Sequence, residues 1–418
     1  MKIFFSAIFN RLQLPSVILF LQLLNFKNFI IWLFSKNKNT EIEEFNHKKV
    51  ALIALYQKGN LRKDILNLIQ QLKRKQYYVI GVNTLKLNPE NLEYFDYFIE
   101  RYNYGRDFGS YKDGFLEIFK LSKRSSLSPS VLMLNDSVFY SYKNIEKFLS
   151  ELEITNEFDV IGATENFEIE HHYGSFCISF ASSVIKNKKF INFWKNYNLS
   201  DMRPKVIKKG EMGLSKVIKK VAASSERIKA IYNIFSFREF LNSRPEIVAN
   251  ADDYSRLSKH TGWKTFTFQE VHKSLVPYMQ NILGVYGGGN DIKSDIDISK
   301  VPIYGVTDLR GYQGFLKSNN IELEDNILNI HVISTLLNVY AEGSQIHQNY
   351  GFNYIMGCGI LKNDAVYRGM MDYSDLVKME SILDKKDFNE YSQILSKSSF
   401  GEKVLVGWKK VAFMHGYI

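Results

Sequence analysis

The sequence contains few cysteines and no cysteine pair with metal-binding or redox spacing. Its two cysteines, Cys177 and Cys358, lie far apart in a chain of 418 residues, and neither belongs to a CxxC motif. This scarcity excludes a disulfide scaffold and a structural zinc site built on cysteine, and it is typical of a reducing compartment. Cys177 lies in the apolar run GSFCISF, residues 174–180, so we expect a buried thiol in a strand.

The chain also lacks low-complexity tracts, internal repeats, long basic runs and zinc-finger spacing. It is 45% hydrophobic, 14% aromatic and 23% charged, which excludes an intrinsically disordered chain and favours two or three folded units. The net charge of +10 suits an anionic partner. Because the basic residues are dispersed, a membrane surface or a phosphorylated substrate is favoured over nucleic acid. Solvated surface lysines are an equal alternative.

The first 34 residues are apolar but contain no small-residue cleavage site, which argues against a secretory signal. Their runs LPSVILFLQLL, residues 14–24, and FIIWLF, residues 29–34, are each shorter than the roughly 20 apolar residues of a spanning helix. We therefore expect residues 1–46 to form a pair of helices in the membrane interface, followed by a polar linker. A weak signal anchor and a helix packed on the protein's own body are the alternatives.

Apolar runs alternate with helical patterns from residue 49 onward. KVALIALY, residues 49–56, is a continuous apolar run of the kind that forms a buried parallel strand. This alternation predicts an α/β fold with an open, mostly parallel nucleotide-binding sheet. Further strands are expected at residues 77–83, 97–100, 130–135, 158–164 and 174–180.

The loop VYGGGNDIKSD, residues 285–295, is the clearest boundary in the second half of the chain. We assign residues 47–285 to the sheet domain and residues 286–418 to a mainly helical region whose role the sequence does not indicate. Within that region the hydrophobic pattern predicts helices at residues 312–318, 327–341 and 375–396.

The stretch RYNYGRDFGSYKDGF, residues 101–115, combines charges of both signs with glycines that permit a close approach of backbone to ligand. Arg106 can pair with a phosphate through two hydrogen bonds, Lys112 can act as a point charge, and Asp107 can accept from ribose hydroxyls. The spacing matches neither GxGxxG nor a P-loop, so kinase and dinucleotide-binding functions lack support. A salt-bridged turn is the structural alternative.

Polar residues follow several of the expected strands at the point where each strand ends. Asn83 ends one strand, the glycine-rich stretch follows another, and Asn135 and Asp136 follow the run VLML. Ligands of open α/β sheets bind outside the carboxyl ends of the strands. The sequence thus predicts one donor site, to which we assign Asn83, Arg101, Asn103, Gly105, Arg106, Asp107, Gly109, Lys112, Asn135 and Asp136.

Two acidic residues are candidates for metal binding and for catalysis. Asp136 is the candidate ligand for Mg²⁺ or Mn²⁺, which prefer carboxylate and phosphate oxygens, although a lone carboxylate after a strand is as often a helix cap or a turn residue. Glu211, at the start of an expected helix, is the candidate catalytic base, and a favourable contact with the helix dipole is the alternative. Asp159 and Asp201 are weaker candidates for the base.

His171 and His172 are the candidate residues on the acceptor side. Adjacent residues of a strand face opposite sides, so the two histidines do not form a natural metal-binding pair. One of them can meet an acceptor hydroxyl or a phosphate, and a position in a surface loop is the alternative.

Taken in order, these segments resemble the rhamnan-synthesis F family of bacterial polysaccharide glycosyltransferases. The resemblance covers about residues 48–235 and rests on KVALIALYQKGNL, NYGRDFGSYKDGF, LMLNDSVFYSYKNIEKFL, FINFWKNY and GEMGLSKVI. It implies a nucleotide-sugar-dependent transferase of the A-type fold, in which Glu211 matches the position of the base. The donor-site residues that it implies are Asn103, Gly105, Arg106, Asp107 and Asp136.

The resemblance further implies transfer of rhamnose or another hexose, with inversion, from a nucleotide-diphosphate donor to a lipid-linked or growing surface-polysaccharide acceptor. Such a protein would be peripheral on the inner, cytoplasmic face of the cytoplasmic membrane. Its partners would be the donor, the acceptor and the membrane surface, without nucleic acid. A non-catalytic membrane-associated scaffold of a glycan assembly complex and a sugar-phosphate transferase are the alternatives.

Overall fold

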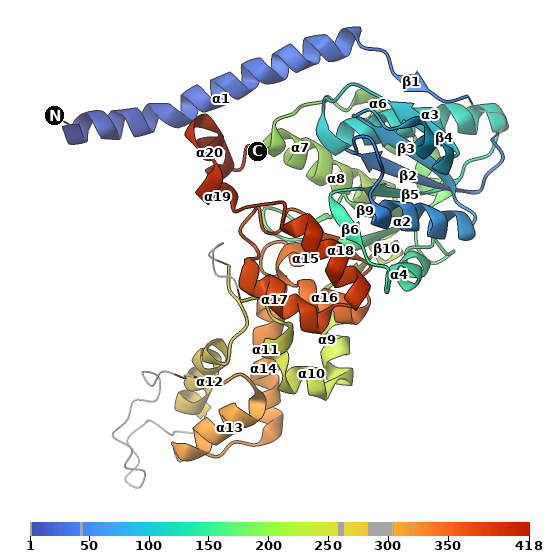
Figure 1. The fold of residues 1–418 in the computed structure, drawn as a ribbon. Helices are drawn as coiled ribbons and strands as arrows, with labels where there is room; N and C mark the ends of the chain where they lie inside the picture. The colour runs from blue at the N-terminus through green and yellow to red at the C-terminus, as the bar shows by residue number, and fades with distance from the viewer. Residues whose placement is uncertain (1, 42–44, 258–262, 283–302, 304, 320) are drawn as a thin grey trace.

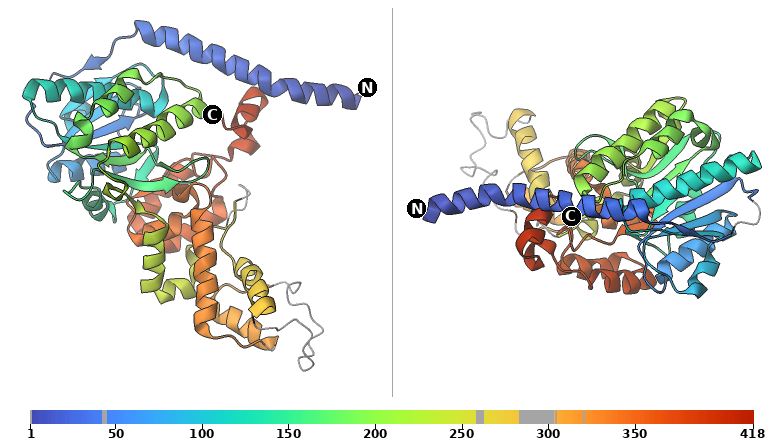
Figure 2. Two further views of the ribbon diagram at one scale, coloured as in Figure 1. Left: turned by 180° about the vertical axis from the view of Figure 1, so that it is seen from behind. Right: turned by 90° about the horizontal axis from the view of Figure 1, so that it is seen from above.

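The protein consists of a mostly parallel central sheet with flanking helices, an apolar N-terminal helix and a helical C-terminal region (Figure 1). The sheet and the C-terminal helices lie side by side, and the N-terminal helix extends along both (Figure 2). This computed structural model describes residues 2–41, 45–257, 263–282, 303, 305–319 and 321–418.

The central sheet runs in the order β1-β4-β3-β2-β5-β9-β7-β10, with β8 paired to β7. Strands β4, β3, β2 and β5 are parallel, as are β7 and β10, whereas β9 is antiparallel to both of its neighbours. The expected mostly parallel sheet is therefore confirmed. The strands are β1 Lys38–Asn39, β2 Lys49–Leu55, β3 Tyr78–Asn83, β4 Tyr97–Glu100, β5 Ser130–Asn135, β7 Val160–Asn166, β8 His172–Tyr173, β9 Cys177–Phe180 and β10 Ile228–Tyr232.

Both faces of the sheet are covered by helices, which explains why its central strands are apolar throughout. On one face α3 (Arg106–Ser125), α6 (Lys188–Asn196) and α8 (Met212–Val221) pack against alternate strand residues such as Leu52 and Val82. On the other face α2 (Lys63–Arg74) and α4 (Ile145–Glu151) pack against the residues between them. Each fully buried aliphatic or aromatic side chain contributes about 1.5–3 kcal/mol to this core.

The N-terminal segment is one continuous helix, α1 (Lys2–Phe34), so the expectation of a helix pair is wrong. The polar residues between the two apolar runs do not form a turn, because Asn25 and Asn28 lie three positions apart on one helical face and contact the loop at Ser200 and Asp201. Several apolar side chains of the helix are exposed, among them Leu19, Leu23 and Phe34. Within the described residues its part Gln13–Phe34 has the length and composition to cross a membrane.

The C-terminal region is joined to the sheet domain by a short antiparallel ribbon, in which β11 (Ile360–Lys362) pairs with β6 (Val138–Tyr140). The buried carboxylate of Asp387 strengthens this junction, because it accepts hydrogen bonds from the backbone N–H of Tyr142 at 2.6 Å and from the Tyr354 hydroxyl at 2.9 Å. A strand pair and a buried carboxylate thus fix the C-terminal region against the end of β5.

The expected helices of the C-terminal region are present, with one difference. Residues 312–318 and 327–341 lie in α13 (Leu309–Ser318) and α14 (Asp325–Ala341). Residues 375–396 form two helices, because Asp384 accepts from the backbone N–H of Lys386 and caps a new one. The expected boundary at residues 285–286 lies outside the described residues.

The remaining helices include α7 Arg203–Val206, α9 Ile234–Ser243, α10 Pro245–Ala249, α11 Ala251–Tyr254, α12 Phe268–Ile282, α15 Gln345–Gln348, α16 Tyr350–Met356, α17 Tyr373–Ile382, α18 Lys385–Leu395, α19 Gly401–Val404 and α20 Gly407–Met414, with short helical turns at Pro89–Tyr94, Ile207–Glu211 and Ser225–Arg227.

The start of the glycine-rich stretch folds around a buried arginine. Arg101 is 3% exposed; its Nε donates to Asp113 Oδ2 at 2.8 Å and its Nη2 donates to the Tyr104 carbonyl at 2.6 Å. Gly109 leaves the space for this guanidinium, because a Cβ there would lie 2.4 Å from the Tyr104 carbonyl oxygen and 2.7 Å from Arg101 Nη2. Gly109 is therefore required by internal packing.

Replacing Gly109 by alanine should destabilise the fold by about 1–3 kcal/mol, because the backbone oxygen of Tyr104 cannot move aside. Gly213→Ala is the matched control, since Gly213 also lies in the first turn of a helix and its Cβ would meet the Phe193 side chain at 3.4 Å. That change should be neutral or stabilising by up to about 1 kcal/mol. Thermal unfolding of both variants measures the difference, and equal melting temperatures would contradict the packing argument.

Candidate functional site

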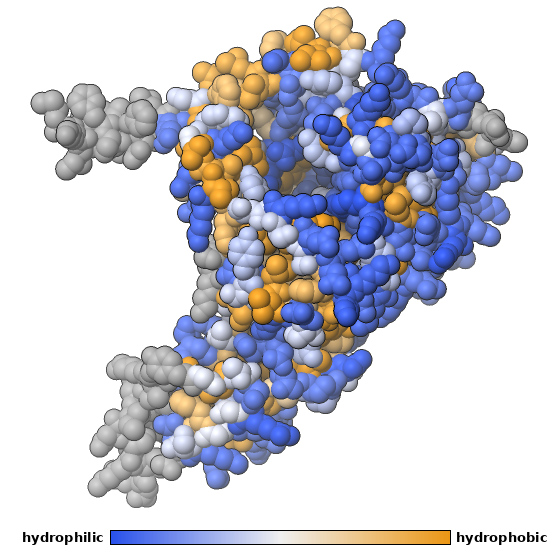
Figure 3. Space-filling model, viewed as in Figure 1, coloured by the Kyte–Doolittle hydropathy of each residue, from blue (hydrophilic) through white to orange (hydrophobic). Residues whose placement is uncertain are grey.

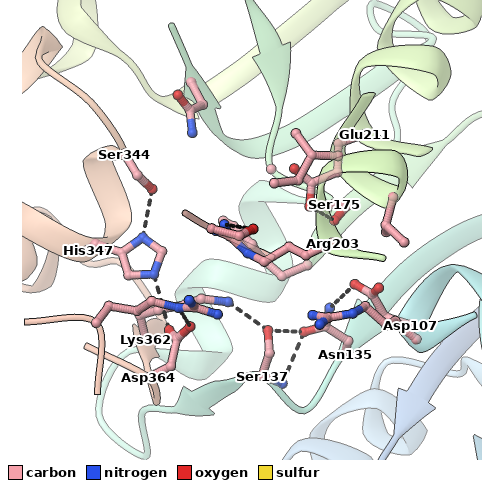
Figure 4. Close-up of a pocket in the computed structure, with 18 of the residues that line it drawn as sticks. Asp107, Asn135, Ser137, Ser175, Arg203, Glu211, Ser344, His347, Lys362 and Asp364 are labelled. Atoms are coloured by element: carbon pink, nitrogen blue, oxygen red, sulfur yellow. Dashed lines mark hydrogen bonds and ion pairs between the residues drawn. The ribbon is translucent and has the colours of Figure 1, made fainter. Parts of the chain in front are cut away.

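A cavity of about 1040 Å³ lies at the carboxyl ends of β2, β5 and β7. Its surface is a hollow beside the apolar edge formed by α1 and α20 (Figure 3). Side chains of the sheet domain line one side, and side chains of the C-terminal region line the other (Figure 4). The polar lining includes Asn103, Arg106, Asp107, Asn135, Asp136, Ser137, His172, Ser175, Asp201, Arg203, Glu211, Ser344, His347, Lys362, Asp364 and Arg368.

Asp107 lies in the first turn of α3 and turns its carboxylate toward the end of β5. Its Oδ1 accepts from the backbone N–H of Phe108 at 3.0 Å, and its Oδ2 accepts from Asn135 Nδ2 at 3.3 Å. Burial and, next to it, the charge of Glu211 together raise the pKa of Asp107 to about 6, against the opposing charge of Arg106. The carboxylate of Asp107 is thus held in the site at a cost in stability.

The turn after β5 is held by its own side chains and by the end of β2. Asn135 Oδ1 accepts from the backbone N–H of Ser137 at 3.1 Å and from its hydroxyl at 2.7 Å. Asp136 Oδ2 accepts from the backbone N–H of Tyr56 at 2.7 Å and from the side-chain amide of Gln57. The carboxylate of Asp136 therefore ties β5 to β2 at the floor of the cavity.

Glu211 lines the same cavity as the turn after β5. It lies at the end of the helical turn Ile207–Glu211 that precedes α8. The Ser175 hydroxyl donates to Glu211 Oε1 at 3.1 Å, and His172 Nε2 lies 3.6 Å from Oε2. His172 Nδ1 lies 2.7 Å from the Glu170 carbonyl oxygen, so the proton on Nδ1 donates to it. Burial lowers the pKa of His172, but the bonds to Glu211 and Glu170 outweigh it and the net pKa is raised. A protonated His172 then donates toward Glu211.

Seven of the residues expected from the sequence line this one cavity: Asn103, Arg106, Asp107, Asn135, Asp136, His172 and Glu211. Gly105 lies just behind it, where its backbone N–H donates to Asp201 Oδ1 at 2.7 Å and its positive φ of 88° favours glycine. The sequence argument from strand ends thus brings together three separate segments of the chain.

The other expected residues are placed in internal contacts outside the cavity. Arg101 and Gly109 form the buried packing described above, and Asn83 binds the backbone N–H and carbonyl of Gln57 at 3.0 and 2.8 Å. Lys112 donates to the Tyr197 carbonyl at 2.8 Å. These side chains shape the loops that carry the site, and they do not reach its surface.

The two histidines have different surroundings, and only His172 belongs to a strand, β8. His172 lines the cavity, whereas His171 contacts Glu165 Oε2 at 3.0 Å and Lys219 Nζ at 2.9 Å outside it. The weaker acidic candidates are both engaged: Asp159 pairs with Arg227 at 3.1 Å, and Asp201 caps the backbone of Gly105.

The sequence argument missed the far wall of the cavity. His347 in α15, Lys362 at the end of β11, Asp364 and Arg368 come from the C-terminal region, and Arg203 begins α7. One signal was present: Lys362 and Asp364 follow a short apolar strand, which is the pattern that singled out Asn135 and Asp136.

A chain of polar contacts orders this far wall (Figure 4). The Ser344 hydroxyl lies 2.8 Å from His347 Nδ1, and His347 Nε2 lies 3.1 Å from Asp364 Oδ1. Asp364 Oδ2 accepts from Arg368 Nε at 3.2 Å. Burial alone would raise the pKa of Asp364, but Lys362, His347 and Arg368 lower it well below its usual range. Asp364 is therefore ionised and holds Arg368 in place.

The described residues do not fit a cation site built from protein groups alone. They contain no cluster of three or more His, Cys, Asp and Glu side chains that could hold a metal ion. Asp136, the expected ligand, already uses one oxygen for Tyr56 and Gln57. The role of Mg²⁺ or Mn²⁺ stays a prediction from the sequence, and no step proposed below depends on an ion.

The fold and the cavity define an α/β protein whose site, at the strand ends, is large enough for a nucleotide-sized ligand. Residues 81–233 match the model of the family described as rhamnan synthesis protein F. This segment supplies the sheet-domain wall of the cavity, including Asp107, Asn135 and Glu211.

Similar proteins are found among curated sequences. The chain is 28% identical over 243 residues to the uncharacterized protein y4gN of Sinorhizobium fredii, covering 54% of this chain and 60% of that protein. It is 30% identical over 173 residues to the virulence protein VirA of Vibrio anguillarum, covering 39% of this chain and 54% of that protein. The matches thus span little more than half the length of these relatives. No solved structure matches the chain.

The raised pKa of Asp107 predicts a specific dependence of stability on pH. A carboxyl whose pKa is higher in the folded protein than in the unfolded chain costs stability once it is ionised. This cost is absent below about pH 4, grows as the pH rises to about 6 and is complete above it. Asp107→Asn should therefore raise the melting temperature at pH 7.5 and leave it unchanged at pH 4. A variant that is equally or less stable at pH 7.5 would contradict the assigned pKa.

Proposed function

We propose that the protein is an inverting glycosyltransferase with an A-type fold, which transfers a sugar from a nucleotide-diphosphate donor to a growing or lipid-linked polysaccharide. The observation that carries this proposal is one cavity at the carboxyl ends of parallel strands, in which Asp107 and Glu211 face Arg106, Arg203 and Lys362. The match to the rhamnan synthesis protein F family supports it. Such a cavity pairs carboxylates, for hydroxyl groups, with cations, for phosphates.

In this mechanism Glu211 is the base. As the acceptor hydroxyl attacks the anomeric carbon, Glu211 takes its proton, the new C–O bond forms, and the bond to the diphosphate breaks with its electron pair remaining on the phosphate oxygen. Ser175 and His172 orient the two carboxylate oxygens of Glu211. Asp107 and Asn135 accept from and donate to hydroxyl groups of the donor, and Arg106 stabilises the developing charge of the diphosphate.

Replacing Glu211 by glutamine should lower kcat about 10²–10⁴-fold, because the variant keeps the shape of the side chain but cannot take a proton. The measurement is release of nucleotide from UDP-, dTDP-, GDP- and CMP-sugars in the presence of bacterial membrane lipids. Glu226→Gln is the matched control, since Glu226 accepts from the Ser224 hydroxyl at 3.0 Å in the short turn before β10 and does not line the cavity. A wild-type rate in Glu211→Gln would overturn the assigned base, and absence of turnover with every donor would favour the scaffold alternative.

We further propose that the acceptor arrives along a membrane surface, at the inner face of the cytoplasmic membrane. The apolar side chains of α1 are exposed, including Leu19 at 58% and Leu23 at 59%. Helix α20 packs on α1 through Phe20 and Trp408, whose ring centroids lie 5.1 Å apart. Met414 of α20 also lines the cavity, so the apolar edge in Figure 3 continues into the site. A lipid-linked substrate can thus lie in the bilayer while its sugar reaches Glu211.

The double variant Leu19→Asp and Leu23→Asp should lose binding to phosphatidylglycerol-containing vesicles in a flotation assay. The two residues lie on one helical face, and each aspartate costs about 2.5–3.5 kcal/mol near the centre of a membrane helix. Val377→Asp is the control, because Val377 is also an exposed apolar residue, at 72%, and lies on α17. Vesicle binding that survives the double change would refute the role of α1.

A further inference from the structure

The wall of the cavity outside the expected donor residues carries cations that lack carboxylate partners. Lys362 Nζ donates to the hydroxyl of Ser137 at 2.8 Å, and Arg203 Nη1 donates to the carbonyl of Gly416 at 3.4 Å. Both acceptors are neutral oxygens. In the part of the chain that the structure describes, neither cation lies within ion-pair distance of a carboxylate. Their positive charge is therefore available to a ligand.

Arg368 completes this wall and is held rigidly. Its Nε pairs with Asp364, its Nη1 donates to the main-chain oxygen of Ile418 at 2.6 Å, and its guanidinium lies 5.6 Å from the centre of the Phe413 ring. These contacts leave the second terminal nitrogen, Nη2, for another acceptor. A guanidinium fixed in this way offers its planar donors to phosphate oxygens with little further loss of entropy.

The cationic groups also repel one another across the cavity. The pKa of Arg203 is lowered by burial and then by the charges of Arg368 and Arg106, and burial together with Arg368 likewise lowers the pKa of Arg106. Like charges gathered in one partly buried site raise the free energy of the empty protein. A polyanion in the cavity removes this repulsion, so binding of an anion is favoured.

We propose that Arg203, Lys362 and Arg368 bind the diphosphate group of a substrate, with Asp364 and His347 as positioning residues that hold Arg368. A diphosphate fits better than a single carboxylate, because the cations come from three segments and require several acceptor oxygens. The inference rests on the proposed sugar transfer in one respect, since the diphosphate belongs either to a nucleotide-sugar donor or to a polyprenyl-diphosphate acceptor. In both cases Lys362 and Arg368 of the C-terminal region complete, together with Arg203 of α7, the phosphate site for chemistry carried out by the sheet domain.

The contact between Lys362 and Ser137 fixes the position of this wall relative to the sheet domain. Ser137 belongs to the turn that carries Asn135 and Asp136, and β11 pairs with β6 directly after that turn. The strand pairing therefore sets the distance between Lys362 and the sheet-domain side of the cavity. A diphosphate bound by this wall lies across from Asp107 and Glu211, which leaves the sugar between the two sides.

The test is calorimetric titration of the full chain with inorganic pyrophosphate and with UDP, dTDP and GDP, in EDTA at fixed ionic strength. We expect wild type to bind at least one of them, and Arg203→Gln and Arg368→Gln each to weaken binding about tenfold or more. Arg244→Gln is the matched control, because Arg244 is an exposed arginine paired with Glu246. Lys362→Gln tests the wall independently if Arg368→Gln does not fold.

A second titration uses vesicles with and without a polyprenyl diphosphate. Loss of nucleoside diphosphate binding in the variants assigns the wall to the donor, whereas loss of binding only to the lipid diphosphate assigns it to the acceptor. Unchanged diphosphate affinity in Arg203→Gln and Lys362→Gln, or a wild type that binds neither ligand, overturns the proposal. Glu211→Gln should keep its diphosphate affinity. Diphosphate binding by wild type without sugar transfer would therefore support the diphosphate site and contradict the proposed transferase activity. Sugar transfer by wild type, with unchanged diphosphate affinity in the arginine and lysine variants, would support the transferase activity and contradict the diphosphate site.

Discussion

The side chain and backbone of Asp201 join helix α1 to the sheet domain beside the cavity. Its carboxylate accepts from the backbone N–H of Gly105 at 2.7 Å and from Asn28 Nδ2 at 2.8 Å, and its own N–H donates to Asn25. Its carbonyl accepts from Arg106 Nε at 3.0 Å. One residue thus fixes the apolar helix α1, the left-handed turn before α3 and the arginine of the site.

A second constraint is the short ribbon of β6 and β11. It places the C-terminal region beside the turn at Asn135, so that Lys362 reaches Ser137 and Asn363 reaches the carbonyl of Asp136. The ribbon is only three residues long, so strand pairing alone is a weak attachment. Asp387 adds to this attachment, because its buried carboxylate accepts a hydrogen bond from the backbone N–H of Tyr142 immediately after β6. Breaking such a buried contact leaves donors unpaired, which costs about 1–3 kcal/mol for each.

The sequence predicts the sheet well because each central strand is buried on both faces and is therefore apolar throughout, as in KVALIAL. Polar residues at strand ends predict the sheet-domain side of the cavity for the same reason, since the carboxyl ends of parallel strands meet at one edge. The pattern does not reveal which strand-end groups turn inward. Asn83 and Arg101 have the same local pattern as Asn135, yet they bind the neighbouring backbone.

The far wall could not be predicted, because its contacts join residues that are distant in the chain: Lys362 and Ser137 are separated by 225 positions. No local periodicity encodes such a pairing. The prediction of two helices in place of α1 was wrong for a different reason. Asn25 and Asn28 interrupt the apolar pattern, but the helix continues through them. Their polarity serves a tertiary contact with Asp201.

Carboxylates and cations are unevenly distributed over the lining of the cavity. Carboxylates that take part in the proposed chemistry, Asp107 and Glu211, come from the sheet domain, and three of its cations come from α7 and the C-terminal region. Asp364 and Glu402 are acidic residues of the far wall, and the charge of Asp364 is balanced by its ion pair with Arg368. A substrate that is sugar at one end and phosphate at the other therefore has one favourable orientation. The sheet domain contributes Arg106 and Arg203 of the cations, and the C-terminal region adds Lys362 and Arg368, so both regions form the one cavity.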